Sequence, residues 1–126
     1  MRLKRFLILW VTLSSAAFSF ADDFVHDNLK YATNSDNSVT LVDGKGANGD
    51  VIIPSDVHYK NKVYVVTAIE HNAFEGNNSI TAVTIPSSVS TIGYSAFNSC
   101  KSLRQVMDAS RVTEMQGFEY TDCSNL

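Results

Sequence analysis

Apolar side chains recur with a constant period along the chain. Residues 69–83 (IEHNAFEGNNSITAV) align with residues 92–106 (IGYSAFNSCKSLRQV) at an isoleucine, at an Ala-Phe pair and at two further aliphatic positions. The offset is 23 at both ends of the alignment (92 − 69 and 106 − 83), and the same step carries Cys100 onto Cys123. Such a period is typical of solenoids, in which each short repeat buries its apolar side chains only by stacking on a neighbour.

Within one repeat, the pattern predicts a short strand followed by a turn-rich return. Residues 80–85 (ITAVTI) have apolar side chains at 80, 83 and 85, which predicts a strand with one face turned inward. Pro86 ends this strand, because proline has no amide to donate to a sheet. In the return, the Ala-Phe pairs are expected to bury Phe74 and Phe97, and the asparagine and glycine residues that follow provide turn chemistry.

The repeating positions form the predicted core, in which each side chain lies beside its equivalent in the next repeat. This predicted ladder consists of Ile69, Phe74, Ile80, Val83, Ile85, Ile92, Phe97, Cys100, Leu103, Val106 and Cys123. The final copy departs from the pattern, because Asp108 takes the place of Ile85 and Glu119-Tyr120 replaces the Ala-Phe pair. A carboxylate at an inward position is unfavourable unless it is solvated or paired, so we expect that repeat to be loosened or frayed.

A known family shares these spacings. Residues 85–106 read Ile-Pro-Ser-Ser-Val-x-x-Ile-Gly-x-x-Ala-Phe-x-x-Cys-x-Ser-Leu-x-x-Val. This pattern resembles the BspA-like (Treponema-type) leucine-rich repeat, and the resemblance covers the chain from about residue 51 onward. It implies a short leucine-rich-repeat solenoid of about two to three 23-residue repeats. An earlier, incomplete copy begins at Ile53-Pro54, but nine extra residues separate it from Ile69.

The segment before the repeats is expected to form a β-rich N-terminal cap, which resembles the entry region of this family. Four segments are predicted as strands: 24–31, 38–42, 51–53 and 63–66. Residues 43–50 form a turn-rich link, and Tyr59-Lys60-Asn61-Lys62 is predicted as a hairpin turn between the last two strands. At the other end, the chain stops at Leu126 halfway through a repeat, which indicates a fragment or a truncated product of a longer protein.

The first 21 residues are typical of a secretory signal peptide. Three basic residues precede an apolar run, and Ser19-Phe20-Ala21 places small residues at the −3 and −1 positions of a cleavage site. The run is shorter than the ~20 apolar residues of a membrane-spanning helix, which favours cleavage over anchoring. We therefore divide the chain into a signal peptide (1–21), a cap region (22–66) and repeats (67–126), and expect a secreted or cell-surface protein without a membrane span in its mature form.

Charge narrows the range of partners. Without residues 1–21 the chain has seven basic and thirteen acidic residues, a formal charge of −6. An acidic chain without Lys/Arg clusters argues against nucleic acid and against anionic membranes as partners. Two cysteines are too few for a disulfide-scaffolded fold. We expect Cys100 and Cys123 to be free, because equivalent positions aim their Cβ atoms the same way; a disulfide is the alternative that an oxidising destination permits.

No catalytic, cofactor-binding or metal site is predicted. Residues 44–49 (GKGANG) match the dinucleotide-binding fingerprint in letters only, since a β-branched run and Pro54 follow where a helix is required. The three histidines lack the spacing of metal ligands, and no Gly-x-Ser-x-Gly elbow is present. Asn77-Asn78-Ser79 is a glycosylation sequon, which matters only in a host with that machinery. We therefore predict a protein that is not an enzyme and that uses no cofactor.

The predicted architecture points to binding. Stacked strands form an extended, rigid surface that solenoids use for recognition. The candidate protein-binding residues on that strand face are Thr81, Ala82, Thr84, Arg104, Gln105 and Met107. The alternative is that they are ordinary solvated strand residues. The resemblance implies adhesion to host matrix proteins or to other cells, but a fold does not dictate a function. A structural cap, or a docking module of a longer protein whose missing C-terminal part is catalytic, is the competing hypothesis.

Overall fold

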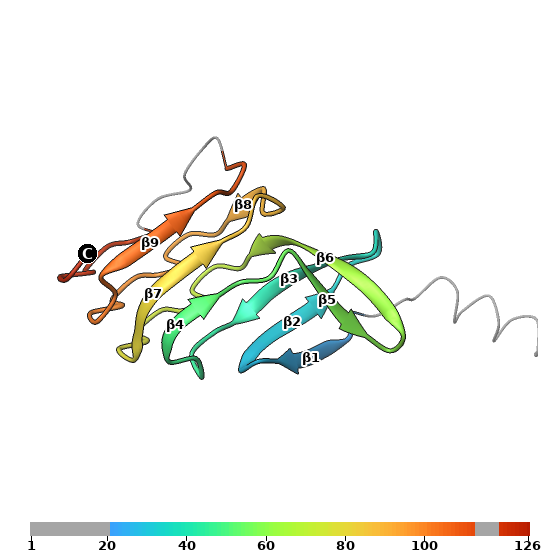
Figure 1. Ribbon diagram of the computed structural model, residues 1–126, viewed down its shortest axis with the longest axis horizontal. Coiled ribbons are helices and arrows are strands. Elements are labelled where there is room, and N and C mark those ends of the chain that lie inside the picture. The colour runs from blue at the N-terminus through green and yellow to red at the C-terminus, as the bar shows by residue number, and fades with distance from the viewer. Residues whose placement is uncertain (1–20, 113–118) are drawn as a thin grey trace, which may run out of the picture.

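The computed structural model describes residues 21–112 and 119–126, which form an all-β structure of two sheets (Figure 1). The signal peptide predicted for residues 1–21 lies outside this range except for Ala21. The strands are β1 (Asp23–His26), β2 (Leu29–Thr33), β3 (Ser38–Asp43), β4 (Gly49–Ile52), β5 (Asp56–Tyr59), β6 (Lys62–Ile69), β7 (Ile80–Ile85), β8 (Thr91–Ile92) and β9 (Gln105–Asp108).

Three antiparallel strand pairs, β1-β2, β2-β3 and β5-β6, lie in the larger sheet, whose order is β1-β2-β3-β6-β5, with β8 paired to β6 off this path. The prediction of one strand over residues 24–31 was wrong, because Asp27 and Asn28 adopt left-handed conformations (φ 49° and 64°) and turn the chain between β1 and β2. Asp and Asn tolerate this conformation better than other non-glycine residues, and two such residues make the turn that suits a tight hairpin. Lys60 and Asn61 turn the chain between β5 and β6 in the same way.

The hairpin of β5 and β6 accounts for the nine extra residues in the first repeat. Ile53 and Ile69 are separated by 16 positions, whereas Ile85 and Ile92 are separated by seven. The additional residues form β5 and the first part of β6, which extend away from the stacked strands (Figure 1). The predicted hairpin turn is therefore present, but its first strand is β5 and not residues 51–53, of which Val51 and Ile52 belong to β4 in the other sheet.

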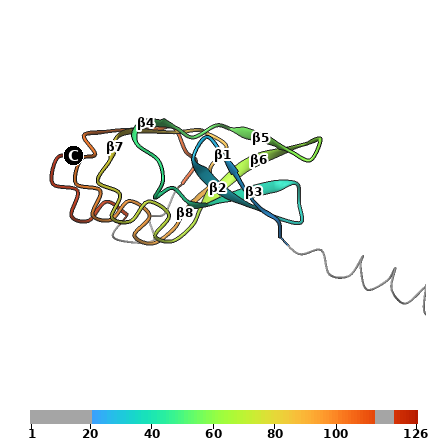
Figure 2. The ribbon, with the colours of Figure 1, turned by 90° about the horizontal axis from the view of Figure 1, so that it is seen from below.

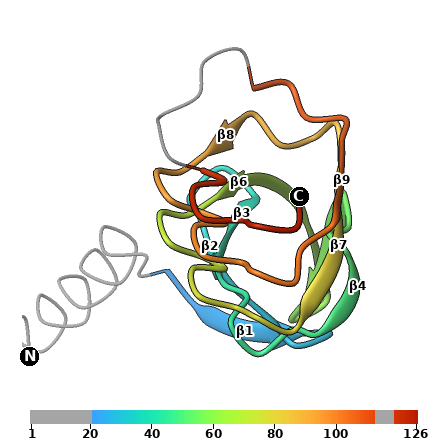
Figure 3. The same cartoon turned by 90° about the vertical axis from the view of Figure 1, so that its left-hand side faces the viewer.

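Parallel strands stack on two sides of a common core. One side consists of β3, β6 and β8, and the other of β4, β7 and β9. Val51, Val83 and Val106 are register partners across the second sheet. The end-on view in Figure 3 shows the chain coiling around the core from one sheet to the other. Because β3 and β4 already pair in parallel with later strands, stacking begins inside the segment 22–66 that the sequence assigned to the cap.

The predicted ladder lies in or against this core. Most of its side chains are fully buried, while Val106 and Cys123 are half-buried. The rings of Phe74 and Phe97 lie 4.9 Å apart at an interplanar angle of 10°. The ring of Tyr120 continues the series at 5.3 Å from Phe97 and 8°. These three rings form an aromatic stack that runs along the axis of the repeats.

The last described repeat is stacked although its sequence departs from the pattern. Asp108 is exposed at the end of β9, where its Oδ1 accepts a hydrogen bond of 2.8 Å from the Ser110 amide. Solvation of this carboxylate removes the penalty expected for an inward position. On the turn side, the Phe97 amide donates to the Glu119 carbonyl at 2.8 Å. Successive turns therefore lie side by side up to this repeat (Figure 2).

Candidate functional site

The outer face of the sheet β4-β7-β9 presents two rows of side chains in register. The strand register gives one row of Asp50, Ala82 and Gln105, and a second row of Ile52, Thr84 and Met107. The intervening row of valines points into the core, because side chains alternate between the faces of a strand. Ile52 is 74% exposed and Met107 is 51% exposed. The face thus combines one row that has a polar side chain at each end with a second row that has an exposed apolar side chain at each end.

A shallow hollow of about 380 Å³ lies at the start of these strands, lined by Asp50, Thr81, Ala82, Arg104 and Gln105. The Thr81 hydroxyl donates to Asp50 Oδ1 at 2.9 Å, which holds the carboxylate across the gap between β4 and β7. Arg104 is exposed and forms no salt bridge with any residue of the described chain. The hollow therefore offers an anchored carboxylate beside a guanidinium that has no ion-pair partner among the residues that the structure describes.

All six candidate residues named from the sequence lie on this sheet or at its rim, and the structure adds two more. Asp50 and Ile52 come from β4, which sequence reasoning placed in the cap region. The echo between Ile53-Pro54 and Ile85-Pro86 was the signal that could have located them. It aligns Asp50 with Ala82 and Ile52 with Thr84, as the sheet register does.

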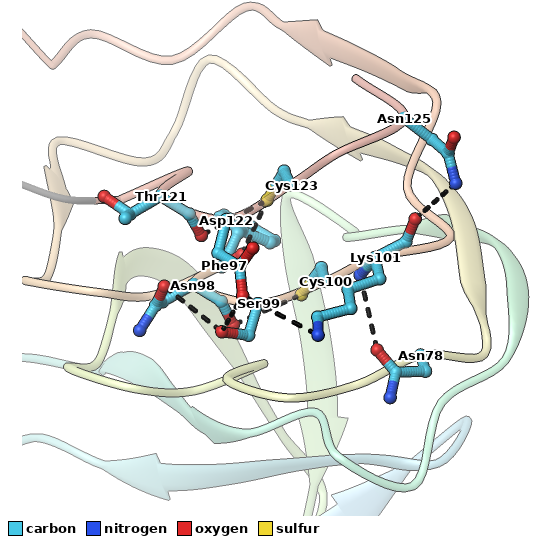
Figure 4. Close-up of polar contacts among 10 residues, drawn as sticks. All are labelled: Asn78, Phe97, Asn98, Ser99, Cys100, Lys101, Thr121, Asp122, Cys123 and Asn125. Atoms are coloured by element: carbon cyan, nitrogen blue, oxygen red, sulfur yellow. Dashed lines mark hydrogen bonds and ion pairs between the residues drawn. The ribbon is translucent and has the colours of Figure 1, made fainter.

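On the turn side, each cysteine thiol donates to a carbonyl of the preceding repeat, as Figure 4 shows for Cys123 and Phe97. Cys100 Sγ lies 3.1 Å from the Phe74 carbonyl oxygen, and Cys123 Sγ lies 3.0 Å from the Phe97 carbonyl oxygen. Both cysteines are free thiols. Burial raises the pKa of the Cys100 thiol to about 12, with a smaller contribution from Cys123. Burial also raises the pKa of the Cys123 thiol, so both sulfurs resist ionisation and are poor nucleophiles.

Thiol titration tests this arrangement. Native protein is expected to label at Cys123 before Cys100, because Cys123 is half-buried whereas Cys100 is fully buried. Denatured protein should give two thiols per chain by absorbance with a chromogenic disulfide reagent. The Cys123→Ser variant serves as the control and should retain only the slow thiol. Finding no thiol after denaturation without reductant would show that a disulfide joins the two residues.

Asn77 holds the same position as Cys100 one repeat earlier, since the step between them (100 − 77) equals the repeat period. Its side chain is buried, and its Nδ2 donates to the carbonyl oxygens of Gly44 at 3.0 Å and Ala47 at 2.9 Å. Its Oδ1 accepts from the amides of Ser79 and Ile80 at 2.8 and 3.1 Å. The sequon at this residue is therefore inaccessible in the folded protein, because its amide nitrogen is already engaged inside the core.

The glycine-rich segment 44–49 has a structural role. It is followed by β4, so the helix N-terminus that a dinucleotide phosphate requires does not follow it. A Cβ atom at Gly44 would lie 2.1 Å from the Phe74 ring, so glycine is required there for the aromatic stack to end against this loop. Among the described residues, no cluster of three or more His, Cys, Asp or Glu side chains could hold a metal ion. The same residues contain no helix long and apolar enough to cross a membrane.

Comparison with known families agrees with this geometry. A family model described as "BspA type Leucine rich repeat region (6 copies)" matches residues 55–126. The chain belongs to the BspA-type leucine-rich-repeat family. This assignment explains why strands, turns and cysteines recur at one spacing. A comparison with curated proteins finds no match.

Solved structures of leucine-rich-repeat proteins share the fold. A leucine rich cell surface protein of Faecalibacterium prausnitzii is 28% identical with a TM-score of 0.73, over 83% of this chain and 29% of its own. A leucine-rich repeat protein of Bacteroides capillosus is 33% identical with a TM-score of 0.63, over 68% of this chain and 64% of its own. The T. pallidum leucine rich repeat protein is 24% identical with a TM-score of 0.70, over 83% of this chain and 48% of its own. At this identity the similarity supports the fold alone.

Proposed function

We propose that the protein is an exported leucine-rich-repeat protein that binds other proteins, in secreted form or at the cell surface, through the outer face of β4-β7-β9. The observation that carries this proposal is the pair of registered rows on that face, with Ile52 and Met107 exposed beside the hollow at Asp50 and Arg104. Exposed apolar side chains next to polar and charged groups are typical of protein interfaces, in which methionine and arginine are enriched.

The rest of the chain supports that surface in this proposal. Residues 22–66 act as the cap region, in which the hairpin of β1 and β2 covers the end of the stack and β4 contributes the first strand of the binding face, while residues 67–126 supply the repeats. About two to three 23-residue repeats would then stack on the cap. The order β1-β2-β3 places β1 at one end of its sheet, which supports a covering role (Figure 1).

The partners in this proposal are extracellular or host macromolecules, and the role is adhesion without catalysis or a cofactor. The description of the F. prausnitzii relative as a cell surface protein supports this localisation. A second candidate function is a structural cap or docking module of a longer protein, whose further part could be catalytic. The observation in its favour is that this chain spans only 29% of that relative.

Charge and polarity reversal on the face tests the proposal. Purified chain is titrated against immobilised fibronectin, fibrinogen and collagen, measured by surface plasmon resonance. For whichever of these binds, the double variant Arg104→Glu/Met107→Asp is expected to weaken binding at least tenfold. The reason is that central interface residues contribute about 1.4 kcal/mol or more each, which corresponds to a tenfold change in affinity.

A matched double variant on another surface provides the control. Lys60→Glu/Val65→Asp makes the same kind of change on the exposed hairpin of β5 and β6 and should leave binding unchanged. Circular dichroism and thermal unfolding check that both variants fold. Equal binding by the wild type and the face variant would refute the face as the interface, and no binding to any of the three would favour the structural or docking role.

Export makes a separate prediction. When the gene is expressed with its first 21 residues in a bacterium that secretes proteins, the exported product should begin at Asp22. The motivation is the cleavage site at Ser19-Phe20-Ala21 that follows the apolar run. N-terminal sequencing measures the outcome, and the Ala21→Arg variant should block processing. Retention of Met1 on a membrane-embedded product would contradict cleavage.

A further inference from the structure

A groove runs along the free edge of β4, the strand that also supplies Asp50 and Ile52 to the proposed binding face. Its volume is about 240 Å³. One wall consists of the consecutive residues Asp50, Val51 and Ile52, and the other is the turn at 26–28 between β1 and β2. Figures 2 and 3 show this hairpin beside β4 at the end of the stack. The two walls belong to different sheets, so the groove separates strands that are not hydrogen-bonded to each other.

Backbone groups of β4 face this groove. Within the described chain β4 is an edge strand that pairs only with β7. The amides of Gly49 and Ile53 donate to carbonyl oxygens on the β7 side, at 2.9 and 3.0 Å. Since peptide groups alternate in direction along a strand, those of Asp50 and Ile52 point away from β7 and toward the groove. A free strand edge of this kind is a template for pairing with another extended chain.

The negative charge of the groove indicates which kind of extended chain would bind there. Its lining includes the acidic residues Asp27 and Asp50 but no lysine or arginine. The Asp50 carboxylate accepts from Thr81 on the β7 side, so Asp27 is the acidic side chain on the opposite wall that an occupant would meet. The Asp27 side chain is 88% exposed, and its Oδ2 lies 3.4 Å from His26 Nε2. Without residues 1–21 the chain as a whole is acidic, with seven basic and thirteen acidic residues. Electrostatic complementarity therefore favours an occupant with basic side chains.

The floor of the groove contains an unused hydrogen-bond donor. Tyr31 lines the groove and is fully buried, and its hydroxyl has no hydrogen-bond partner among the described residues. Burial, and secondarily the negative charge of Asp27, raises the pKa of this hydroxyl, so it remains protonated. A buried polar group without a partner is unfavourable. Because the hydroxyl oxygen has almost no accessible surface, a carbonyl oxygen of an occupant could accept from it only after the side chains that cover it move aside.

We propose that this groove binds an extended, basic segment of a partner protein, which adds to β4 as a further strand. Backbone hydrogen bonds to Asp50 and Ile52 would hold the segment, and a lysine or arginine side chain would reach Asp27. This site goes beyond the proposed binding face, because it uses the backbone edge of β4 and not the outer surface of the sheet. Asp50 and Ile52 belong to both sites, whereas Asp27 lines only the groove and Arg104 and Met107 lie only on the face, so variants at these three residues distinguish the two sites.

Titration with short peptides tests the proposal. The probe is the capped, fluorescently labelled hexapeptide Val-Lys-Val-Lys-Val-Lys, and its fluorescence anisotropy is followed as the full chain is added. Binding is expected to be at least tenfold tighter than for Val-Glu-Val-Glu-Val-Glu. N-methylation of alternate amides on the edge that faces β4 should abolish it, because the peptide then cannot donate to the strand. No binding of the lysine peptide at millimolar protein would overturn the proposal.

Variants locate the site. Ile52→Pro removes the free amide and should weaken binding at least tenfold, whereas Ile52→Val keeps the amide and should bind normally. Asp27→Asn is expected to weaken binding two- to fivefold, whereas Asp56→Asn, an exposed carboxylate outside the groove, should change nothing. Loss of peptide binding in Arg104→Glu/Met107→Asp, with Ile52→Pro unaffected, would place the peptide on the outer face and overturn the groove.

Hydrogen exchange on the wild-type chain does not depend on how these variants fold. With saturating lysine peptide, the amides of Asp50 and Ile52 should exchange at least tenfold more slowly, because each gains a hydrogen bond in the added strand. The Asn78 amide, which is on the turn side of the stack, provides the internal control and should keep its rate. Unchanged exchange at Asp50 and Ile52 with peptide bound would refute strand addition.

Discussion

Replacing Phe97 with alanine is expected to lower the free energy of unfolding by about 3–5 kcal/mol. The ring has no exposed surface and lies between the rings of Phe74 and Tyr120, with centroids 4.9 and 5.3 Å away. Removing it leaves a cavity in the middle of the aromatic stack and also removes two ring-stacking contacts. Neighbouring repeats cannot close that cavity easily, because backbone hydrogen bonds fix the spacing between their turns.

Urea denaturation followed by circular dichroism measures this loss. Phe97→Leu, which keeps most of the buried volume, should cost less than the alanine variant. Val65→Ala, at a side chain that is exposed on β6, should stay within about 0.5 kcal/mol of the wild type. A loss below about 1 kcal/mol at Phe97 would contradict its position in the stack, since that value is typical of exposed sites.

The repeat period predicted much of the fold, because stacked repeats must have apolar residues at equivalent positions. Side chains at equivalent positions of neighbouring repeats occupy the same environment, so the chain needs apolar residues there in every copy. The 23-residue step therefore located β7 and the burial of Phe74 and Phe97. It could not locate β3 and β4 as stacked strands, because the step from Val51 to its register partner Val83 (83 − 51) is longer than the period.

Strand boundaries were harder to predict where the same residue pattern fits either one long strand or two short ones. The apolar residues on both sides of Asp27-Asn28 resemble one continuous strand, and only the left-handed backbone at these two residues reveals a hairpin. Assigning 51–53 to the cap also concealed Asp50 and Ile52 as members of the outer face. Both omissions arise at the end of the stack, where the chain has no preceding repeat to impose the period.

Asn77 and Cys100 occupy equivalent positions of successive repeats, but their side chains contact different segments of the chain. Cys100 meets the regular turn of the preceding repeat and donates to one carbonyl, that of Phe74. Asn77 meets the shorter loop at 44–47, which presents the carbonyls of Gly44 and Ala47 together. A thiol has one weak donor, whereas a carboxamide has two donors and an acceptor. Asparagine therefore suits the junction between the loop and the first full repeat.

The Asn77→Ala variant is accordingly expected to lose about 2–4 kcal/mol of stability, because each buried polar group left without a partner costs roughly 1–3 kcal/mol. The substitution leaves the Ala47 carbonyl and the Ser79 amide without the side chain that satisfies them. Asn77→Cys should recover part of the loss, because a thiol can still donate to one carbonyl as Cys100 does. Urea denaturation measures the free energy of unfolding of each variant.

The neighbouring Asn78 supplies the matched control for this prediction. Its side chain is exposed, and its Oδ1 accepts a single hydrogen bond of 3.3 Å from the Lys101 amide (Figure 4). Water can replace that bond when the side chain is removed, so Asn78→Ala should change the free energy of unfolding by less than about 1 kcal/mol. If Asn77→Ala and Asn78→Ala unfold at the same urea concentration, the side chain of Asn77 does not stabilise the junction.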